Sequence, residues 1–169
     1  MKFNDQQIAK ISKEVQNIVK GKVLFDHFSR GRYSTDSSLY QITPLGAVLP
    51  KDQNDVLNLM EYSQKNSIPL LARGGGSSQC GQTVGESIVL DYSKYQNQIL
   101  ELNVEEKYVW VQPGIVLDTL NAYLKPYGLW FPVDVSTSSR ATIGGMTGNN
   151  SCGSRSLYYG NMVNNVLAG

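Results

Sequence analysis

Apolar residues return at the spacing of an α-helix in three parts of the chain. The first part covers residues 5–20, begins at a cap provided by Asn4 or Asp5, and carries its stripe on Ile8, Ile11, Val15, Ile18 and Val19. The second follows the capping residue Asp52 and carries along one side Val56, Leu59, Met60 and Ser63. The third ends near Pro126 and Gly128 and carries Leu117, Leu120 and Leu124. We expect these segments to be packing helices.

Short apolar runs between the helices predict strands. Residues 45–49, 69–72 and 87–91 are such runs, and the run at 69–72 indicates a buried strand. Residues 99–103 and 108–112 alternate apolar and polar side chains on either side of a polar turn, which is typical of a hairpin.

The order of these elements predicts the fold class. Helices and strands alternate in the first half of the chain and paired strands follow, which favours an α+β architecture with two small lobes that meet near residue 92. Residues 26–44 are polar and predict irregular structure, and residues 166–169 resemble a strand that has just begun. Trp110 and Trp130 are expected in the core.

Composition narrows the classes of function. The chain has 169 residues, of which 41% are hydrophobic and 17% charged, enough for the core of one domain. Its net charge of +1 offers no basic face, so no nucleic-acid partner is expected. One histidine, His27, and two cysteines, Cys80 and Cys152, are too few for a multi-histidine, zinc or iron–sulfur site, so no metal is expected. No apolar run would span a bilayer and no signal peptide opens the chain, which favours a cytoplasmic protein.

The glycines concentrate in two stretches, at residues 73–82 and 141–153. In the first, a strand leads into three glycines at 74–76 and two serines, an arrangement whose successive N–H groups can surround a phosphate or pyrophosphate. The Rossmann pattern fails because Gln79 stands where a third glycine is needed, and the Walker A pattern fails because Gln82 replaces its lysine. A glycine-rich surface turn is the alternative interpretation.

The second stretch is uncharged and dense in small hydrogen-bonding residues. We interpret it as a segment that lies flat along a polar ligand, offering backbone N–H groups and directional bonds from Thr142, Asn149, Asn150 and Ser151. A single phosphate would not need both stretches, whereas a dinucleotide would occupy both.

Several motifs, taken in order, resemble the FAD-binding domain of the flavoprotein family named after vanillyl-alcohol oxidase and p-cresol methylhydroxylase (PCMH). They are Pro-Leu-Leu-Ala-Arg-Gly-Gly-Gly-Ser-Ser at 69–78, Ile-Val-Leu-Asp at 88–91, Val-Gln-Pro-Gly at 111–114, Tyr-Gly-Leu at 127–129 and Ala-Thr-Ile-Gly-Gly at 141–145. Within the family, the chain is most similar to the branch of D-lactate, glycolate and D-2-hydroxyglutarate dehydrogenases. Arg-Gly-Arg-Tyr-Ser-Thr-Asp at 30–36 is similar to members with an additional C-terminal iron–sulfur domain.

The resemblance implies a domain organisation. A two-lobed FAD-binding domain of the PCMH type would occupy residues 39–169, after an N-terminal helix and extension at residues 1–38. The lobes would cover residues 39–92 and 93–169, and the second would be truncated, because the family's domain continues and a substrate domain follows it. The catalytic base of this branch lies in that missing part, so no catalytic residue is assigned.

The resemblance also implies the cofactor site. FAD would be bound by Arg73, Gly74, Gly75, Gly76, Ser77, Ser78, Gly81, Gln82, Pro132, Asp134, Thr142, Gly144, Gly145, Asn150 and Gly153. Residues 74–78 would hold its pyrophosphate, and Ser77 stands where the family usually has a threonine. The loop lacks the histidine through which some members attach flavin, so FAD is expected to be non-covalent.

The implied reaction is oxidation of a D-2-hydroxy acid to the 2-oxo acid, with hydride transfer to flavin. A missing domain would hold the substrate, and electrons would pass to an iron–sulfur domain or a partner chain, in an enzyme that could lie at the periphery of a membrane. The alternative is a non-catalytic FAD-binding fragment, and the chain alone is expected to be inactive. Asp91 is expected to end its strand and bond the next loop, Cys152 to pack as a small side chain, and Tyr158 and Tyr159 to be core or rim aromatics.

Overall fold

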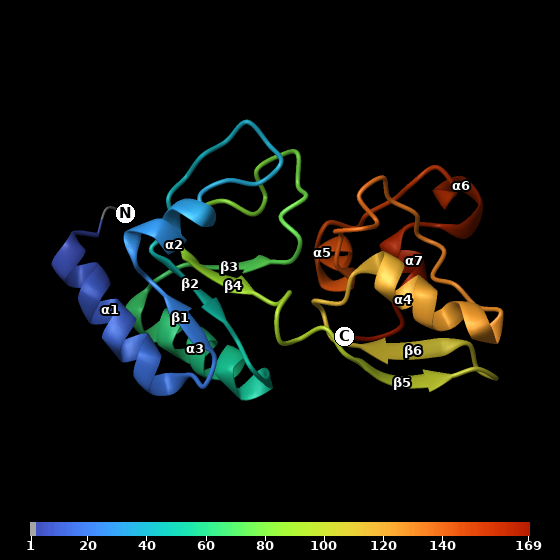
Figure 1. Ribbon diagram of the computed structural model, residues 1–169, viewed down its shortest axis with the longest axis horizontal. Helices are drawn as coiled ribbons and strands as arrows, with labels where there is room; N and C mark the ends of the chain where they lie inside the picture. The colour runs from blue at the N-terminus through green and yellow to red at the C-terminus, as the bar shows by residue number, and fades with distance from the viewer. Residues whose placement is uncertain (1–2) are drawn as a thin grey trace.

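The N-terminal apolar stripe forms the first helix of a computed structural model that describes residues 3–169 (Figure 1). Helix α1 (Asp5–Ile18) begins at Asn4, whose side chain accepts from the Gln7 N–H while the Gln7 side chain accepts from the Asn4 N–H. This reciprocal cap satisfies two N–H groups that a helix end leaves free. Ile8, Ile11 and Val15 are buried, so the predicted stripe is the packed face of the helix.

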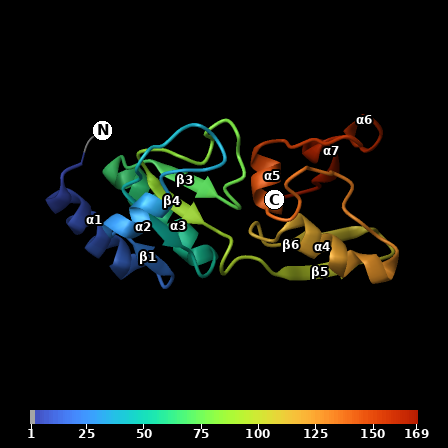
Figure 2. The same cartoon turned by 45° about the horizontal axis from the view of Figure 1, so that its top comes forward.

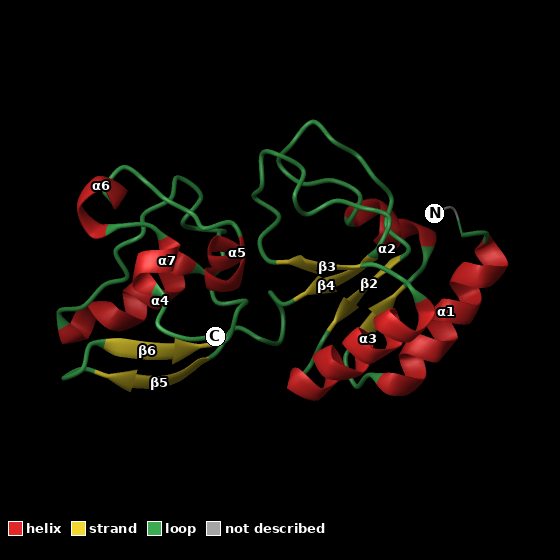
Figure 3. Ribbon diagram, turned by 180° about the vertical axis from the view of Figure 1, so that it is seen from behind, coloured by secondary structure: helices red, strands yellow, loops and turns green. Residues whose placement is uncertain are grey.

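The first lobe is a four-stranded sheet covered on both faces. The strands β1 (Lys22–Leu24), β2 (Gly46–Leu49), β4 (Ile88–Asp91) and β3 (Leu70–Arg73) lie in that order, with β1 antiparallel and the rest parallel. Helices α1 and α3 (Gln53–Asn66) pack on one face through Val48, Ile88 and Leu90, and these two helices lie together below the sheet in Figure 3. The other face, formed by Ala47, Leu49 and Val89, lies against Tyr33 just after α2 (His27–Arg32).

A buried carboxylate connects two turns at one end of this lobe. Asp52 caps α3 by accepting from the Asp55 N–H. The Asp55 side chain, in a residue that is 1% exposed, accepts from the N–H groups of Lys20, Gly21 and Lys51 at 2.8–2.9 Å. Because all these donors are backbone groups, Asp55 holds the end of α1 and the start of α3 against the sheet.

The second lobe is smaller and follows a linker at residues 92–98. A hairpin of β5 (Ile99–Asn103) and β6 (Tyr108–Val111) is covered by α4 (Leu117–Leu124), which continues into the 3-10 turn η1 (Lys125–Tyr127). Three short helices complete it: α5 (Ile143–Gly148), α6 (Ser156–Tyr159) and α7 (Met162–Asn165). Its own core contains Leu117, Leu120, Val133 and Met146. The two lobes lie side by side in Figures 1 and 2.

The α+β class and the two lobes are confirmed, and the hairpin and all three long helices form as expected. The sheet of the first lobe includes β1, which pairs Val23 with Val48, and α1 belongs to the same core. The described residues before position 39 are therefore built into the first lobe. No helix in the described part of the chain is long and apolar enough to cross a membrane.

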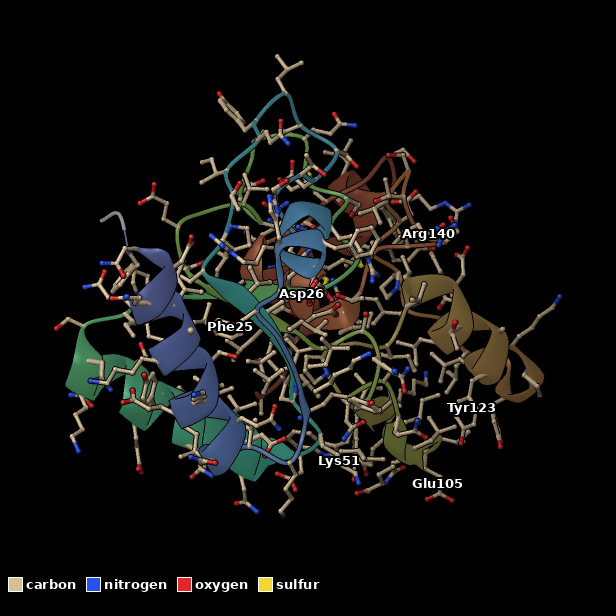
Figure 4. The ribbon with its side chains drawn as sticks, turned by 60° about the vertical axis from the view of Figure 1, so that its left-hand side comes forward. Phe25, Asp26, Lys51, Glu105, Tyr123 and Arg140 are labelled. Atoms are coloured by element: carbon tan, nitrogen blue, oxygen red, sulfur yellow. The ribbon has the colours of Figure 1, made fainter. Side chains whose placement is uncertain are left out.

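Four local predictions about the elements were wrong. The polar segment 26–44 contains α2, which Asp26 caps by accepting from the Ser29 N–H (Figure 4 marks Asp26 at its start). The strand predicted as buried, β3, is half-buried because it lies at the sheet edge. Residues 166–169 form no strand, and the second glycine-rich stretch is not an extended segment but contains α5.

Three side chains predicted to be packed are exposed. Met60 is 55% exposed, because the buried contact of α3 is centred on Leu59 one position earlier. Trp110 is 46% exposed, because Val109 and Val111 on either side of it point into the core of the second lobe and alternation turns Trp110 away. Trp130 is 40% exposed and rests edge-to-face on Tyr159, so both residues belong to the rim.

Candidate functional site

A cleft of about 980 Å³ lies between the two lobes. Residues 71–80 with Gln82 and Thr83 form its first wall, at and beyond the end of β3. The opposite wall comes from residues 135–137 and from α5 with the segment that follows it. This volume is in the range of sites for cofactor-sized ligands.

Backbone amides without a partner line the first wall. The N–H groups of residues 74–79, which we call the amide cradle, donate to no acceptor in the part of the chain that the structure describes. Gly76 in the middle has a left-handed backbone, with φ of 64°, which turns the chain sharply. Because exposed N–H groups in such a turn attract oxyanions, the cradle fits a phosphate or pyrophosphate, as the sequence predicts.

The glycines also let the lobes approach closely. A Cβ on Gly74 would lie 2.0 Å from Thr142 Oγ1, and a Cβ on Gly75 would lie 2.1 Å from the carbonyl oxygen of Arg140. We call this contact of Gly74 and Gly75 with residues 140–142 the inter-lobe seam. Two glycines predicted as ligand contacts therefore also have a structural role, because no side chain fits at the seam.

Helix α5 uses its own amides inside the protein. The Ile143 N–H donates to Ile115 O, the Gly144 N–H to Pro113 O, and the Gly145 N–H to the capping hydroxyl of Thr142. The prediction that residues 141–153 lie flat and offer backbone N–H groups to a ligand was therefore wrong for the start of the helix. The second wall offers side chains to a ligand instead, and Gly144 and Gly145 are among its lining residues.

Arg73 stabilises the first wall of the cleft through hydrogen bonds and a ring contact. Its guanidinium donates to the carbonyl oxygens of Thr35, at 2.8 Å, and Thr83, at 3.2 Å, and lies over the ring of Tyr33. The Tyr33 hydroxyl donates to Asp91 at 2.7 Å, and burial together with this carboxylate raises the pKa of Tyr33. Asp91 also accepts from Ser93, so it ends its strand and bonds the following loop, as expected.

The loop that follows α2 packs against the first wall. Thr83 donates to Asp36 at 3.0 Å, and Ser37 donates to the Gly76 carbonyl. Burial raises the pKa of Asp36, but hydrogen bonds from Ser38 and Thr83 outweigh it and hold that pKa below its usual value. Gly81, with φ of 75°, lies where a Cβ would meet the ring of Tyr40 at 2.6 Å, so its role beside the wall is structural.

Asp134 and Gly153 form a turn beside the cleft. The Asp134 carboxylate accepts from Ser154 Oγ at 2.8 Å and from the Arg155 N–H at 3.1 Å, and these bonds lower its pKa. A Cβ on Gly153 would overlap the Asp134 carbonyl oxygen. Both residues shape the chain beyond the second wall.

The structure brings eleven of the fifteen residues of the predicted site to the lining of one cleft: Arg73, Gly74, Gly75, Gly76, Ser77, Ser78, Gln82, Thr142, Gly144, Gly145 and Asn150. Gly81, Pro132, Asp134 and Gly153 are not among the lining residues. The lining also includes Ser136 and Thr137, which sequence reasoning missed although two adjacent hydroxyls stand there.

The two walls are joined by a side-chain bond, in which Gln82 Nε2 donates to Asn149 Oδ1 at 2.9 Å. Both cysteines line the cleft and are exposed, so the prediction that Cys152 packs in the interior was wrong. Among the described residues, no group of three histidine, cysteine or carboxylate side chains could hold a metal ion.

A cleft of this size between two lobes, with consecutive free amides on one wall, is typical of a protein that binds a dinucleotide. Residues 44–168 match the family model of the FAD binding domain, and the chain belongs to that family. The resemblance stated from the motifs is thereby confirmed, and FAD is the cofactor.

The relatives are FAD-linked oxidoreductases of greater length. A D-2-hydroxyglutarate dehydrogenase of Pseudomonas putida is 44% identical over 151 residues, which are 88% of this chain and 15% of that protein. Glycolate oxidase subunit GlcD of Bacillus subtilis is 35% identical over 158 residues, 90% of this chain and 33% of that protein. The solved alkyldihydroxyacetonephosphate synthase superposes with a TM-score of 0.80 at 21% identity, covering 90% of this chain and 31% of its own, which shows the shared fold. The chain thus spans a third or less of each of these proteins.

Proposed function

We propose that this chain is the FAD-binding portion of a dehydrogenase that oxidises a D-2-hydroxy acid to the corresponding 2-oxo acid. The proposal that this chain binds FAD rests on the amide cradle, whose six consecutive N–H groups line the cleft without an acceptor in the described part of the chain. The names of the relatives, which include D-2-hydroxyglutarate dehydrogenases and a glycolate oxidase subunit, support the substrate class.

Different residues of the chain have different proposed roles in binding FAD. The amides of residues 74–78 receive the pyrophosphate, and the Ser77 hydroxyl, which has no partner within the described chain, adds a donor. Ser78 accepts from the N–H groups of Cys80 and Gln82, so it sets the shape of the loop. Thr142, Gly144, Gly145 and Asn150 form the facing wall, while Pro132, Asp134 and Gly153 fix the turn behind it. When bound, FAD supplies a two-electron acceptor for the substrate hydride.

The cofactor is proposed to be non-covalent. The lining of the cleft contains no histidine, and His27 is the first residue of α2. Precipitation of the loaded protein in acid should therefore release all of its flavin to the supernatant. Yellow colour that stays with the washed precipitate would contradict this part of the proposal.

Loading with FAD tests the site. The purified chain should retain yellow flavin after gel filtration and melt at a higher temperature with FAD than without it. Ser77→Ala should weaken FAD binding several-fold without changing the melting temperature of the free protein, because Ser77 makes no internal hydrogen bond to lose. Ser12→Ala on α1 is the matched control and should bind FAD as the unchanged protein does. A folded chain that binds no FAD would refute the proposal.

Catalysis is proposed to require the rest of a longer protein, which would supply the substrate domain and the catalytic base. Electrons would leave through an iron–sulfur domain or a partner chain, and we propose that the protein acts in the cytoplasm. Under anaerobic conditions, D-2-hydroxyglutarate, D-lactate or glycolate should bleach flavin in the full-length protein. The FAD-loaded chain alone should stay yellow with all three, as a non-catalytic binding fragment would. Bleaching by the chain alone, or no bleaching by the full-length protein, would contradict the assignment.

A further inference from the structure

A second cavity lies on the other side of the inter-lobe seam. It has a volume of about 340 Å³. Gly74, Gly75 and Thr142 line both this cavity and the FAD cleft, so the seam is the wall between them. We call the second cavity the seam pocket.

The charges around the seam pocket are unbalanced. Its lining residues include three arginines, Arg32, Arg73 and Arg140, and one acidic residue, Asp91. Arg73 is committed to the carbonyl oxygens on the first wall, and Asp91 is committed to Tyr33 and Ser93. The lining side chains therefore carry a net positive charge, and the guanidinium donors left without an acceptor are those of the other two arginines.

Arg32 and Arg140 have no internal partner. Within residues 3–169, neither guanidinium makes a hydrogen bond or an ion pair with another side chain or a carbonyl group. Arg32 ends α2 in the first lobe, and Arg140 precedes α5 in the second lobe, where Figure 4 labels it. The adjacent Ser139 hydroxyl also lines the pocket without a partner inside the described chain. Two free forked donors from opposite lobes suit an anion with several oxygens between them.

We propose that the seam pocket binds a small dianion with phosphate or carboxylate oxygens, held between Arg32 of the first lobe and Arg140 of the second. The seam separates this ligand from the cradle, so it binds beside FAD and not in place of it. Because its two charged contacts come from different lobes, the ligand joins them across the seam. A free phosphate and a dicarboxylate share this chemistry.

Titration calorimetry of the FAD-loaded chain tests the proposal. Inorganic phosphate and glutarate are titrated separately at constant ionic strength. The anion that binds more tightly shows whether the ligand is a phosphate or a dicarboxylate. We expect saturable binding of at least one, with a dissociation constant of roughly 1 mM or lower. Arg32→Gln and Arg140→Gln should each weaken that binding at least tenfold. Lys13→Gln, which removes one positive charge from α1 far from the pocket, should leave it unchanged.

Three results would overturn the proposal. The first is that neither anion saturates. The second is that binding persists unchanged in both arginine variants, which places the anion elsewhere. The third is that phosphate binds only to the FAD-free chain and is displaced by FAD, which places it in the amide cradle. Circular dichroism and FAD titration of each variant establish that the fold and the FAD cleft are retained.

Discussion

Adding one methyl group at the inter-lobe seam is expected to lower the stability of the protein by an amount that the contact distances allow us to estimate. In Gly74→Ala the new Cβ would lie 2.0 Å from Thr142 Oγ1, and ordinary contact begins at 3.4 Å, so the two groups must separate by about 1.4 Å. Thr142 is 2% exposed, and its hydroxyl caps α5. Rotating it away loses the cap, which costs about 1 kcal/mol, and moving the lobes apart costs about 1–3 kcal/mol of overpacking strain.

We therefore expect Gly74→Ala to lower the free energy of unfolding by about 1–3 kcal/mol in a urea titration. Separating the walls of the cleft should cost about one charge-assisted hydrogen bond to FAD. Because a loss of about 1.4 kcal/mol is a factor of ten in binding, FAD affinity should fall roughly tenfold. Gly148→Ala is the matched control. It also lines the cleft, but a Cβ there has open space, so its stability should be unchanged or slightly higher.

A double-mutant cycle makes the reasoning refutable. Thr142→Ala removes the atom at 2.0 Å and leaves only its Cβ, at 3.1 Å from the new methyl. By itself it should cost about 1 kcal/mol through the lost cap. Combined with Gly74→Ala, it should cost less than the sum of the single changes by about 1 kcal/mol, because most of the clash is relieved. Strict additivity, or a Gly74→Ala protein as stable as the unchanged chain, would show that the lobes do not meet at this seam.

Three further results are expected. Asp55→Ala should lower the free energy of unfolding by roughly 3–5 kcal/mol in a urea titration, since three backbone N–H groups at buried or part-buried positions lose a charged acceptor, and Asp55→Asn, which keeps one oxygen, should cost less. Burial raises the pKa of Tyr33 and of Tyr62, aided by Asp91 and Glu14 respectively, above the ordinary 10.0. The folded protein then keeps protons that the unfolded chain loses, so the stability contributed by these two tyrosines should be fully present below pH 10. Urea midpoints should fall as the pH rises further, and should fall less with phenylalanine at both positions. Arg73→Lys should lose one of two loop carbonyl bonds, costing about 1 kcal/mol locally and increasing proteolysis of the glycine loop.

Sequence patterns located the site better than they explained it. Both glycine-rich stretches line one cleft, and the cradle is where the strand runs into residues 74–78. The reason for Gly74 and Gly75 could not be read from the chain, because the atoms that exclude a side chain belong to residues 140–142, more than sixty positions away. Local composition likewise indicated a second stretch that offers its N–H groups to a ligand, whereas the carbonyl groups of Pro113 and Ile115 accept from the first N–H groups of a helix.

The errors in the fold have comparable causes. Helix α2 is only six residues long and contains Gly31, so neither length nor propensity distinguished it from a loop. The size of Trp110 favoured the core, but the alternation that correctly predicted the hairpin also places it on the face opposite Val109 and Val111, which pack against the core. At position 110, the alternation of the strand predicts the exposure of the side chain better than its hydrophobicity does.

The separation of the two cores bears on the order in which a ribosome builds the molecule. All buried residues of the first lobe's core precede Asp91, at which its sheet is complete. A nascent chain can therefore fold this lobe, amide cradle included, before residues 140–142 have been translated, since domains made first generally fold first. The seam closes only when that later segment emerges, so FAD meets a half-built site early in synthesis and a complete one only afterwards.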